Sequence, residues 1–150
     1  MMSGVPAPMR ILGLAGLIPF AGLAVLAIAG DDPIRLAALR AQIGYGAVIV
    51  SFLGAIHWGI AVQTPVLAGW PRMSWGVTPS LLGWVALLLP PLPALVLLAV
   101  ALLTALVSDE YSFGGDDPRA WFLKLRRLLS IGAILSLLAT LIGIVVEGAP

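Results

Sequence analysis

Residues 81–107 read LLGWVALLLPPLPALVLLAVALLTALV, a long apolar run that prolines interrupt once. The run belongs to thirty-six consecutive uncharged residues, from 73 to 108, whereas one helix needs only about 20 residues to cross a bilayer. The three prolines in the middle end a helix, because proline lacks a donor N–H and its ring clashes with the preceding turn. The segment therefore predicts two short membrane-spanning helices, at about residues 74–89 and 92–107, joined by a tight turn.

Three other apolar segments are long enough to cross a membrane, and they lie at about residues 11–30, 43–63 and 128–146. A strand exposed to lipid would leave its backbone groups unpaired, so every span is predicted to be a helix. The fold class expected from the sequence is an all-α integral membrane protein with five transmembrane helices, which form a single membrane domain over residues 1–150.

The composition supports this class. Hydrophobic residues make up 61% of the chain and charged residues only 10%, whereas a soluble domain carries about 25% charged residues. There is no cysteine, which excludes disulfides, iron–sulfur clusters and thiol catalysis. The formal charge of +1 argues against nucleic acid as a partner, because a binding face would need a concentrated basic stripe.

Two Asp-Asp-Pro motifs, at residues 31–33 and 116–118, indicate helix starts. Aspartate caps the free amide groups of a first turn, and proline suits the first helical position. We expect an interfacial helical lead-in after each motif, at about residues 33–42 and 118–127.

The basic residues predict the orientation, because Lys and Arg concentrate in cytoplasmic connections. Of the basic residues, only Arg35 and Arg40 are expected on the side opposite the N-terminus, because they lie in the connection after the first span. Six basic residues are expected on the side of the N-terminus: Arg10, Arg72, Arg119, Lys124, Arg126 and Arg127. The chain is therefore predicted to have its N-terminus inside and its C-terminus outside.

Four of these basic residues gather before the last span: Arg119, Lys124, Arg126 and Arg127. Polybasic segments beside a span gain roughly 1 kcal/mol per charge at an anionic membrane surface. We expect this cluster to contact lipid headgroups or an acidic partner, with a pure insertion signal as the alternative.

His57 is the only histidine, and it falls inside the predicted span at 43–63. An ionisable group within a span is a functional candidate by default. Thr78 and Ser80 fall at a similar depth, and Trp58 is adjacent, so these four residues form the candidate cofactor-binding set. Three roles remain open: a neutral histidine that hydrogen-bonds a hydroxyl or carbonyl of a neighbouring helix, a ligand or cofactor contact, and proton handling. The first is the expected role, and no metal site is predicted.

Small residues recur at intervals of four on the same segment. They are Ala47, Ser51, Ala55 and Gly59, with Gly54 beside them. Small side chains let a second helix approach closely, so these five residues are the predicted helix-packing positions.

Four sequence motifs together resemble a known family. They are GLAGLIPF at residues 13–20, SFLGAIHWG at 51–59, WGVTPSLLGW at 75–84 and the pair Trp121-Phe122. They are similar to motifs of the bacterial and mitochondrial "transmembrane protein sixty-nine" family, a domain of unknown function. The resemblance implies five spans in an energy-transducing membrane, here the bacterial inner (cytoplasmic) membrane, and it implies no reaction.

No hydrolytic triad, phosphate-binding glycine loop or metal motif is present in the sequence, so we expect no enzyme and no cofactor. The expected function is a non-enzymatic accessory subunit or assembly factor that packs against a larger inner-membrane complex of respiratory or photosynthetic electron transfer. Its partners would be membrane lipid and other integral membrane subunits. The alternative is a small binding protein that holds a tetrapyrrole (a haem or chlorophyll-type pigment), a quinone or a lipid near His57.

Overall fold

The computed structural model describes residues 5–113 and 120–147, and all regular structure in these two ranges is helical. The helices are α1 (Ala7–Ala15), α2 (Leu17–Ala29), α3 (Asp32–Gln63), the short 3-10 helix η1 (Pro65–Leu67), α4 (Trp70–Leu88), α5 (Pro91–Phe113) and α6 (Ala120–Glu147). The predicted all-α class is confirmed for this part of the chain.

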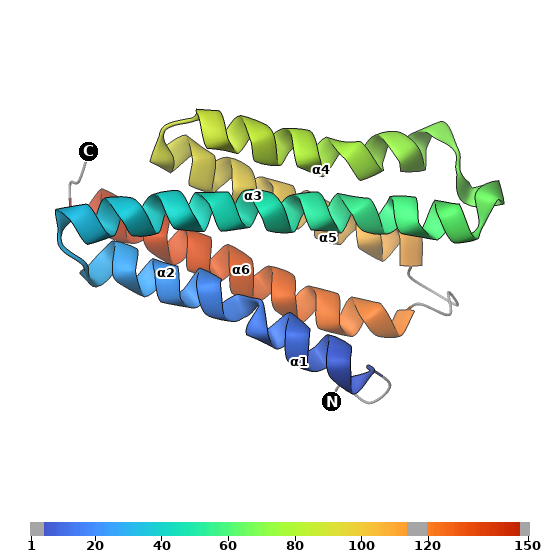
Figure 1. Ribbon diagram of the computed structural model, residues 1–150, viewed down its shortest axis with the longest axis horizontal. Coiled ribbons are helices and arrows are strands. Elements are labelled where there is room, and N and C mark those ends of the chain that lie inside the picture. Colours follow the sequence, from blue (N-terminus) through green and yellow to red (C-terminus); the bar gives the residue numbers. More distant parts are fainter. Residues whose placement is uncertain (1–4, 114–119, 148–150) are drawn as a thin grey trace.

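The long helices lie side by side along one axis; α1 continues into α2 in the same direction, and from α2 to α6 successive long helices run in opposite directions (Figure 1). Helix α3 contacts α2, α4 and α5, and α6 contacts α1, α2 and α5. The core between them is apolar, with Val50, Leu98 and Leu137 fully buried. One end of the bundle therefore brings together the ends of α3 and α5 and the starts of α1, α4 and α6.

Four segments are long and apolar enough to cross a membrane: Ala7–Ala29, Asp32–Gln63, Pro91–Phe113 and Trp121–Val146. The chain is thus a multi-pass membrane protein. Helix α4 packs along α3 beside them.

Helices α3, α4, α5 and α6 are longer than the predicted spans, whereas the span expected at 11–30 is divided into α1 and α2 at Gly16. Helix α3 covers both the lead-in expected at 33–42 and the span expected at 43–63 without a break. Helix α5 continues past residue 107 to Phe113, so Asp109 and Glu110 belong to it. The second Asp-Asp-Pro motif lies outside the described residues. At the first motif, the Asp31 side chain accepts a hydrogen bond from the Ile34 amide (3.4 Å), as expected for a helix cap.

Helices α1 and α2 meet at Gly16, three residues before Pro19. Because proline has no N–H, a regular helix would lose the hydrogen bond from residue 19 to the carbonyl four residues before it. Two polar side chains of α3 contact this segment. The Tyr45 hydroxyl donates to the Gly16 carbonyl (2.9 Å), and the Gln42 amide nitrogen donates to the Phe20 carbonyl (3.2 Å). These bonds fasten the bent N-terminal segment to α3.

Helices α3 and α4 approach closely at small residues. A Cβ at Gly54 would overlap the Gly76 carbonyl oxygen, and a Cβ at Gly83 would lie 2.9 Å from the Ala47 carbonyl oxygen. Of the predicted packing positions, Ala47 and Gly54 lie in this contact, and the Ser51 hydroxyl donates within its own helix to the Ala47 carbonyl (2.8 Å).

The packing prediction is wrong for Ala55 and Gly59, which are exposed. The reason is helix geometry. A four-residue step overshoots one turn of 3.6 residues by about 40°, so a stripe spaced by four rotates away from its partner. The buried stripe of α3 alternates steps of three and four instead, through Val50, Gly54, His57 and Ala61.

Candidate functional site

Three helices place charged and polar side chains together inside the bundle, near the end described above. His57 comes from α3, Asp109 from α5, and Arg126 and Ser130 from α6, and each is at most 3% exposed. The His57 Nε2 atom lies 3.1 Å from Asp109 Oδ1, and Arg126 Nε donates to Asp109 Oδ2 (2.6 Å). Arg126 Nη1 donates to the Ser130 hydroxyl (2.5 Å). We call these four residues the buried charge cluster.

The neighbours of His57 indicate which of its ring nitrogens donates. Its Nδ1 atom lies 3.4 Å from Arg72 Nη1, which can only donate. A neutral imidazole with its proton on Nε2 satisfies both contacts, since Nε2 then donates to Asp109 and Nδ1 accepts from Arg72. The charges of Asp109 and Arg126 then cancel, and the buried charge cluster is neutral as a whole.

Aromatic rings cover the cluster. The Phe113 ring stacks on the His57 ring, with centroids 5.7 Å apart and planes 23° apart. Phe122 meets Phe113 edge to face at 6.3 Å, and Trp121 meets Phe122 at 6.2 Å. The charged side chains are almost fully buried, and the low dielectric around them strengthens their interaction.

A second acid–arginine pair lies next to the first. Glu110 follows Asp109 in the sequence, and Arg127 follows Arg126. Arg127 donates two hydrogen bonds to the Glu110 carboxylate, of 2.5 and 2.6 Å. This pair is exposed, with the Arg127 side chain 57% accessible. The same two helices thus carry one buried and one exposed ion pair in adjacent positions.

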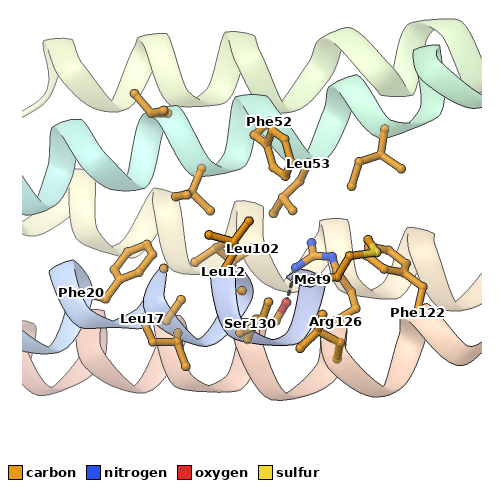
Figure 2. A pocket seen from close by; sticks show the side chains of 18 of the residues that line it. Met9, Leu12, Leu17, Phe20, Phe52, Leu53, Leu102, Phe122, Arg126 and Ser130 are labelled. Atoms are coloured by element: carbon orange, nitrogen blue, oxygen red, sulfur yellow. Dashed lines mark hydrogen bonds between the residues drawn. The ribbon is translucent and has the colours of Figure 1, made fainter. Parts of the chain in front are cut away.

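A cavity of about 700 Å³ opens beside the cluster, between α1, α2, α3, α5 and α6. Its wall is almost entirely aliphatic and aromatic, and its polar side chains are Arg126, Ser130 and Tyr45, whose hydroxyl is bonded to the Gly16 carbonyl; Figure 2 shows the first two. Leu12, Leu17 and Phe20 line it from the N-terminal helices, and Phe52 lines it from α3.

Arg126 has one nitrogen that its partners do not use. Nε and Nη1 are bonded to Asp109 and Ser130, whereas Nη2 is buried and has no hydrogen-bond partner among the described residues. An unmade hydrogen bond on a buried charged group costs more than the roughly 1–3 kcal/mol of a neutral one. A guanidinium with a spare donor therefore lies in the wall of an apolar cavity.

A smaller hollow of about 260 Å³ borders the cluster at His57, and it is lined by His57, Pro71, Arg72, Trp75, Ser108 and Ser112. His57 borders this polar hollow, and Arg126 borders the apolar cavity. Asp109 connects the two residues.

Comparison with known proteins shows the family to which this chain belongs. A family described as "Protein of unknown function (DUF3429)" matches residues 5–142. The chain belongs to the DUF3429 family. Transmembrane protein 69 of Xenopus tropicalis is 37% identical over 146 residues, which cover 94% of this chain and 56% of that protein. Transmembrane protein 69 of Mus musculus is 30% identical over 141 residues, which cover 91% and 56%.

The resemblance drawn from the four sequence motifs is therefore confirmed. This DUF3429 chain spans about half the length of the curated relatives it matches. No solved structure matches it.

Of the predicted cofactor set in this DUF3429 protein, only His57 joins the site. Trp58 is exposed, and its indole nitrogen donates to the Met73 carbonyl (3.2 Å). The Thr78 hydroxyl donates within its own helix to the Ser74 carbonyl (3.0 Å), and Ser80 is half-buried. The expected hydroxyl partner of His57 is wrong, because Asp109 occupies that position.

The prediction for the basic cluster before the last span needs a correction. Arg126 does not reach lipid headgroups, because it is buried against Asp109 and Ser130, and Arg127 is held by Glu110. Lys124 is exposed, and Arg119 lies outside the described residues.

Sequence reasoning missed Asp109 because it ended the fourth span at the last uncharged residues. A signal was present: two adjacent acids close one helix, and two adjacent arginines follow near the start of the next. In residues 5–113 and 120–147, no three His, Asp or Glu side chains gather as a metal site would require.

Proposed function

We propose that this DUF3429 protein binds a hydrophobic molecule taken from the surrounding membrane. The observation that carries the proposal is the apolar cavity of about 700 Å³ with the Arg126 guanidinium in its wall. Ligand sites are typically mostly apolar, about 300–1,000 Å³ in volume, with a few placed polar groups. Both the size and the lining fit that description.

The mouth of the cavity supports uptake from lipid. Four of its lining residues are also strongly exposed: Met9, Leu12, Val48 and Phe52. All four are apolar, so the opening between α1 and α3 suits acyl chains better than water. A molecule dissolved in the bilayer could enter sideways through this opening.

The cluster geometry favours a quinone or lipid over a tetrapyrrole. An axial ligand needs a histidine nitrogen that faces the metal. Both nitrogens of His57 face protein groups instead, Asp109 at 3.1 Å and Arg72 at 3.4 Å. We propose no catalytic role for this site and no resident metal.

We propose further that five helices cross the bacterial inner membrane, with the N-terminus inside and the C-terminus outside. Arg10, Arg72 and Lys124 lie near the starts of α1, α4 and α6, at one end of the bundle, whereas Arg35 and Arg40 lie at the other (Figure 1). This asymmetry supports the orientation under the positive-inside rule. Helix α4 has 19 residues, close to the roughly 20 that a span needs.

The accessory-subunit role, beside a respiratory or photosynthetic complex, stays a prediction. Helix α4 exposes Leu81 and Trp84, and such side chains fit lipid and a partner helix equally well. The cavity distinguishes the two functions, because a laterally packed scaffold needs none.

Purification in a mild detergent, followed by solvent extraction and mass spectrometry, tests the proposal. We expect about one hydrophobic molecule per chain. Val48→Trp places a bulky ring at the cavity mouth and should remove most of that molecule. Val62→Trp is the matched control, because Val62 is an exposed valine of the same helix outside the cavity lining. Equal small-molecule content in both variants and the parent would overturn the proposal, and stoichiometric membrane subunits alongside would favour the accessory role.

A further inference from the structure

The unused donor of Arg126 narrows the class of ligand. Its other nitrogens are bonded to Asp109 and Ser130, so the buried Nη2 is the nitrogen left to bond a molecule in the cavity that Arg126 lines. A guanidinium has donors and no acceptor. The group on the ligand that meets Arg126 must therefore be a hydrogen-bond acceptor, and a pure hydrocarbon would leave the donor unsatisfied.

The charges decide which kind of acceptor fits. Asp109 already neutralises Arg126, with 2.6 Å between Nε and Oδ2. An anionic headgroup on Nη2 would bring a second negative charge to a guanidinium that one carboxylate already neutralises, and like charges disfavour each other strongly at low dielectric. Arg72 lies on the far side of His57, in the wall of the smaller hollow, and Arg127 is engaged by Glu110. A neutral acceptor such as a carbonyl oxygen leaves the charges balanced.

The shape of the wall indicates what carries that acceptor. Phe122, Arg126 and Ser130 follow one another at intervals of four on α6, and all three line the cavity. Phe113 and Trp121 line it as well, and both rings contact the Phe122 ring. Aromatic side chains gain stabilisation beyond area burial when they pack against another aromatic ring in an offset or edge-to-face arrangement.

The rest of the cavity suits a hydrocarbon tail. Beyond Ser130, the lining of α6 ends with Ala133, and Leu17 and Phe20 of α2 also line the cavity. Figure 2 shows Leu17 and Phe20 on the side of the cavity away from Phe122. The cavity thus has one side with the unused Arg126 donor and another whose side chains are apolar or, in Tyr45, already hydrogen-bonded.

We infer that the cavity takes a neutral lipid of the quinone class, a flat carbonyl-bearing ring with an apolar tail, and that Arg126 Nη2 donates a hydrogen bond to a ring carbonyl. This inference rests on the proposed function and specifies the ligand of the same cavity. The bond assigns the spare donor a partner without adding charge.

Titration of the purified protein with three ten-carbon probes tests the inference. The probes are decylubiquinone (a neutral ring carbonyl), decanoate (an anionic head) and decane (no head). We expect decylubiquinone to bind tightest. Arg126→Lys keeps the positive charge but loses the forked donors, and it should weaken decylubiquinone binding about tenfold or more while leaving decane binding unchanged.

The outcomes separate the two levels of the proposal. Tighter binding of decanoate than of decylubiquinone would overturn the quinone class and leave the hydrophobic-ligand function standing. Unchanged decylubiquinone affinity in Arg126→Lys would overturn the role of Arg126. No binding of any probe would overturn the function itself. If Arg126→Lys does not fold, the double variant Asp109→Asn with Arg126→Gln, which removes both charges, replaces it. The order of affinities in the unaltered protein remains decisive in either case.

Discussion

Helices α3 and α4 meet through glycine, alanine and proline, whereas α5 and α6 meet at one end through two acid–arginine pairs. In the first contact, backbone lies against backbone, and Pro79 lies where a Cβ on Gly54 would point. In the second, Asp109 and Glu110 pair with Arg126 and Arg127. The difference teaches that a contact made by shape is sensitive to added atoms, whereas a contact made by charge is sensitive to a missing partner.

The largest effect is expected from Asp109→Asn, which keeps the shape and removes the charge. Arg126 would remain buried without a counter-charge, and breaking a buried pair in this way costs about 3–5 kcal/mol. The free energy of unfolding in mixed micelles measures the loss. A loss no greater than that of Glu110→Gln would show that burial does not distinguish the two pairs.

His57→Leu should come next, with a loss of about 1.5–3 kcal/mol, because Asp109 loses a donor to a charged group. His57→Gln is the matched variant. Its amide can donate to Asp109 and accept from Arg72, so it should retain more stability than leucine does. The same unfolding measurement ranks the two, and equal losses would contradict a hydrogen-bonding role for the imidazole.

Gly54→Val tests the shape-based contact. Its side chain would overlap the Gly76 carbonyl, and overpacking of this kind costs about 1–3 kcal/mol. Gly59→Val is the control on the same helix, because a Cβ at Gly59 meets nothing within 4 Å. Similar melting temperatures for the two variants would argue against a close α3–α4 approach.

The smallest effect is expected from Glu110→Gln, which opens the exposed pair with Arg127. Surface ion pairs contribute about 0–1 kcal/mol, since water and salt screen them. A loss well above 1 kcal/mol in the unfolding assay would mean that the pair is shielded in the membrane, and the contrast between the two pairs would then fail.

The helices could be predicted from the sequence because their causes are local. Apolar runs, the prolines after Leu89 and the cap at Asp31 act on neighbouring residues. The extent of α5 could not be predicted, because the predicted span ended at the first charged residue. That Asp109 is neutralised by Arg126 depends on the packing of α5 against α6, which the local sequence does not show.

The site was predictable only in part, for a similar reason. His57 is an ionisable group inside an apolar run, and the sequence displays that directly. Its partners depend on how α3, α5 and α6 are rotated relative to one another, and no local pattern specifies those rotations. Thr78 illustrates the limit, since it lies at a plausible depth but bonds to its own helix.

The adjacent pairs between α5 and α6 also bear on how the chain enters the membrane. Asp109 is synthesised 17 residues before Arg126, the cation that neutralises it. A lone charge costs up to about 2.5–3.5 kcal/mol on biological insertion scales, the value for the centre of a helix, and Asp109 lies closer to the end of α5. If α5 and α6 entered the bilayer one at a time, Asp109 and Arg126 would each enter without a counter-charge. If they entered together as a hairpin, the two charges would neutralise each other. Helices α5 and α6 should therefore leave the translocation machinery together and insert into the bilayer as one helical hairpin.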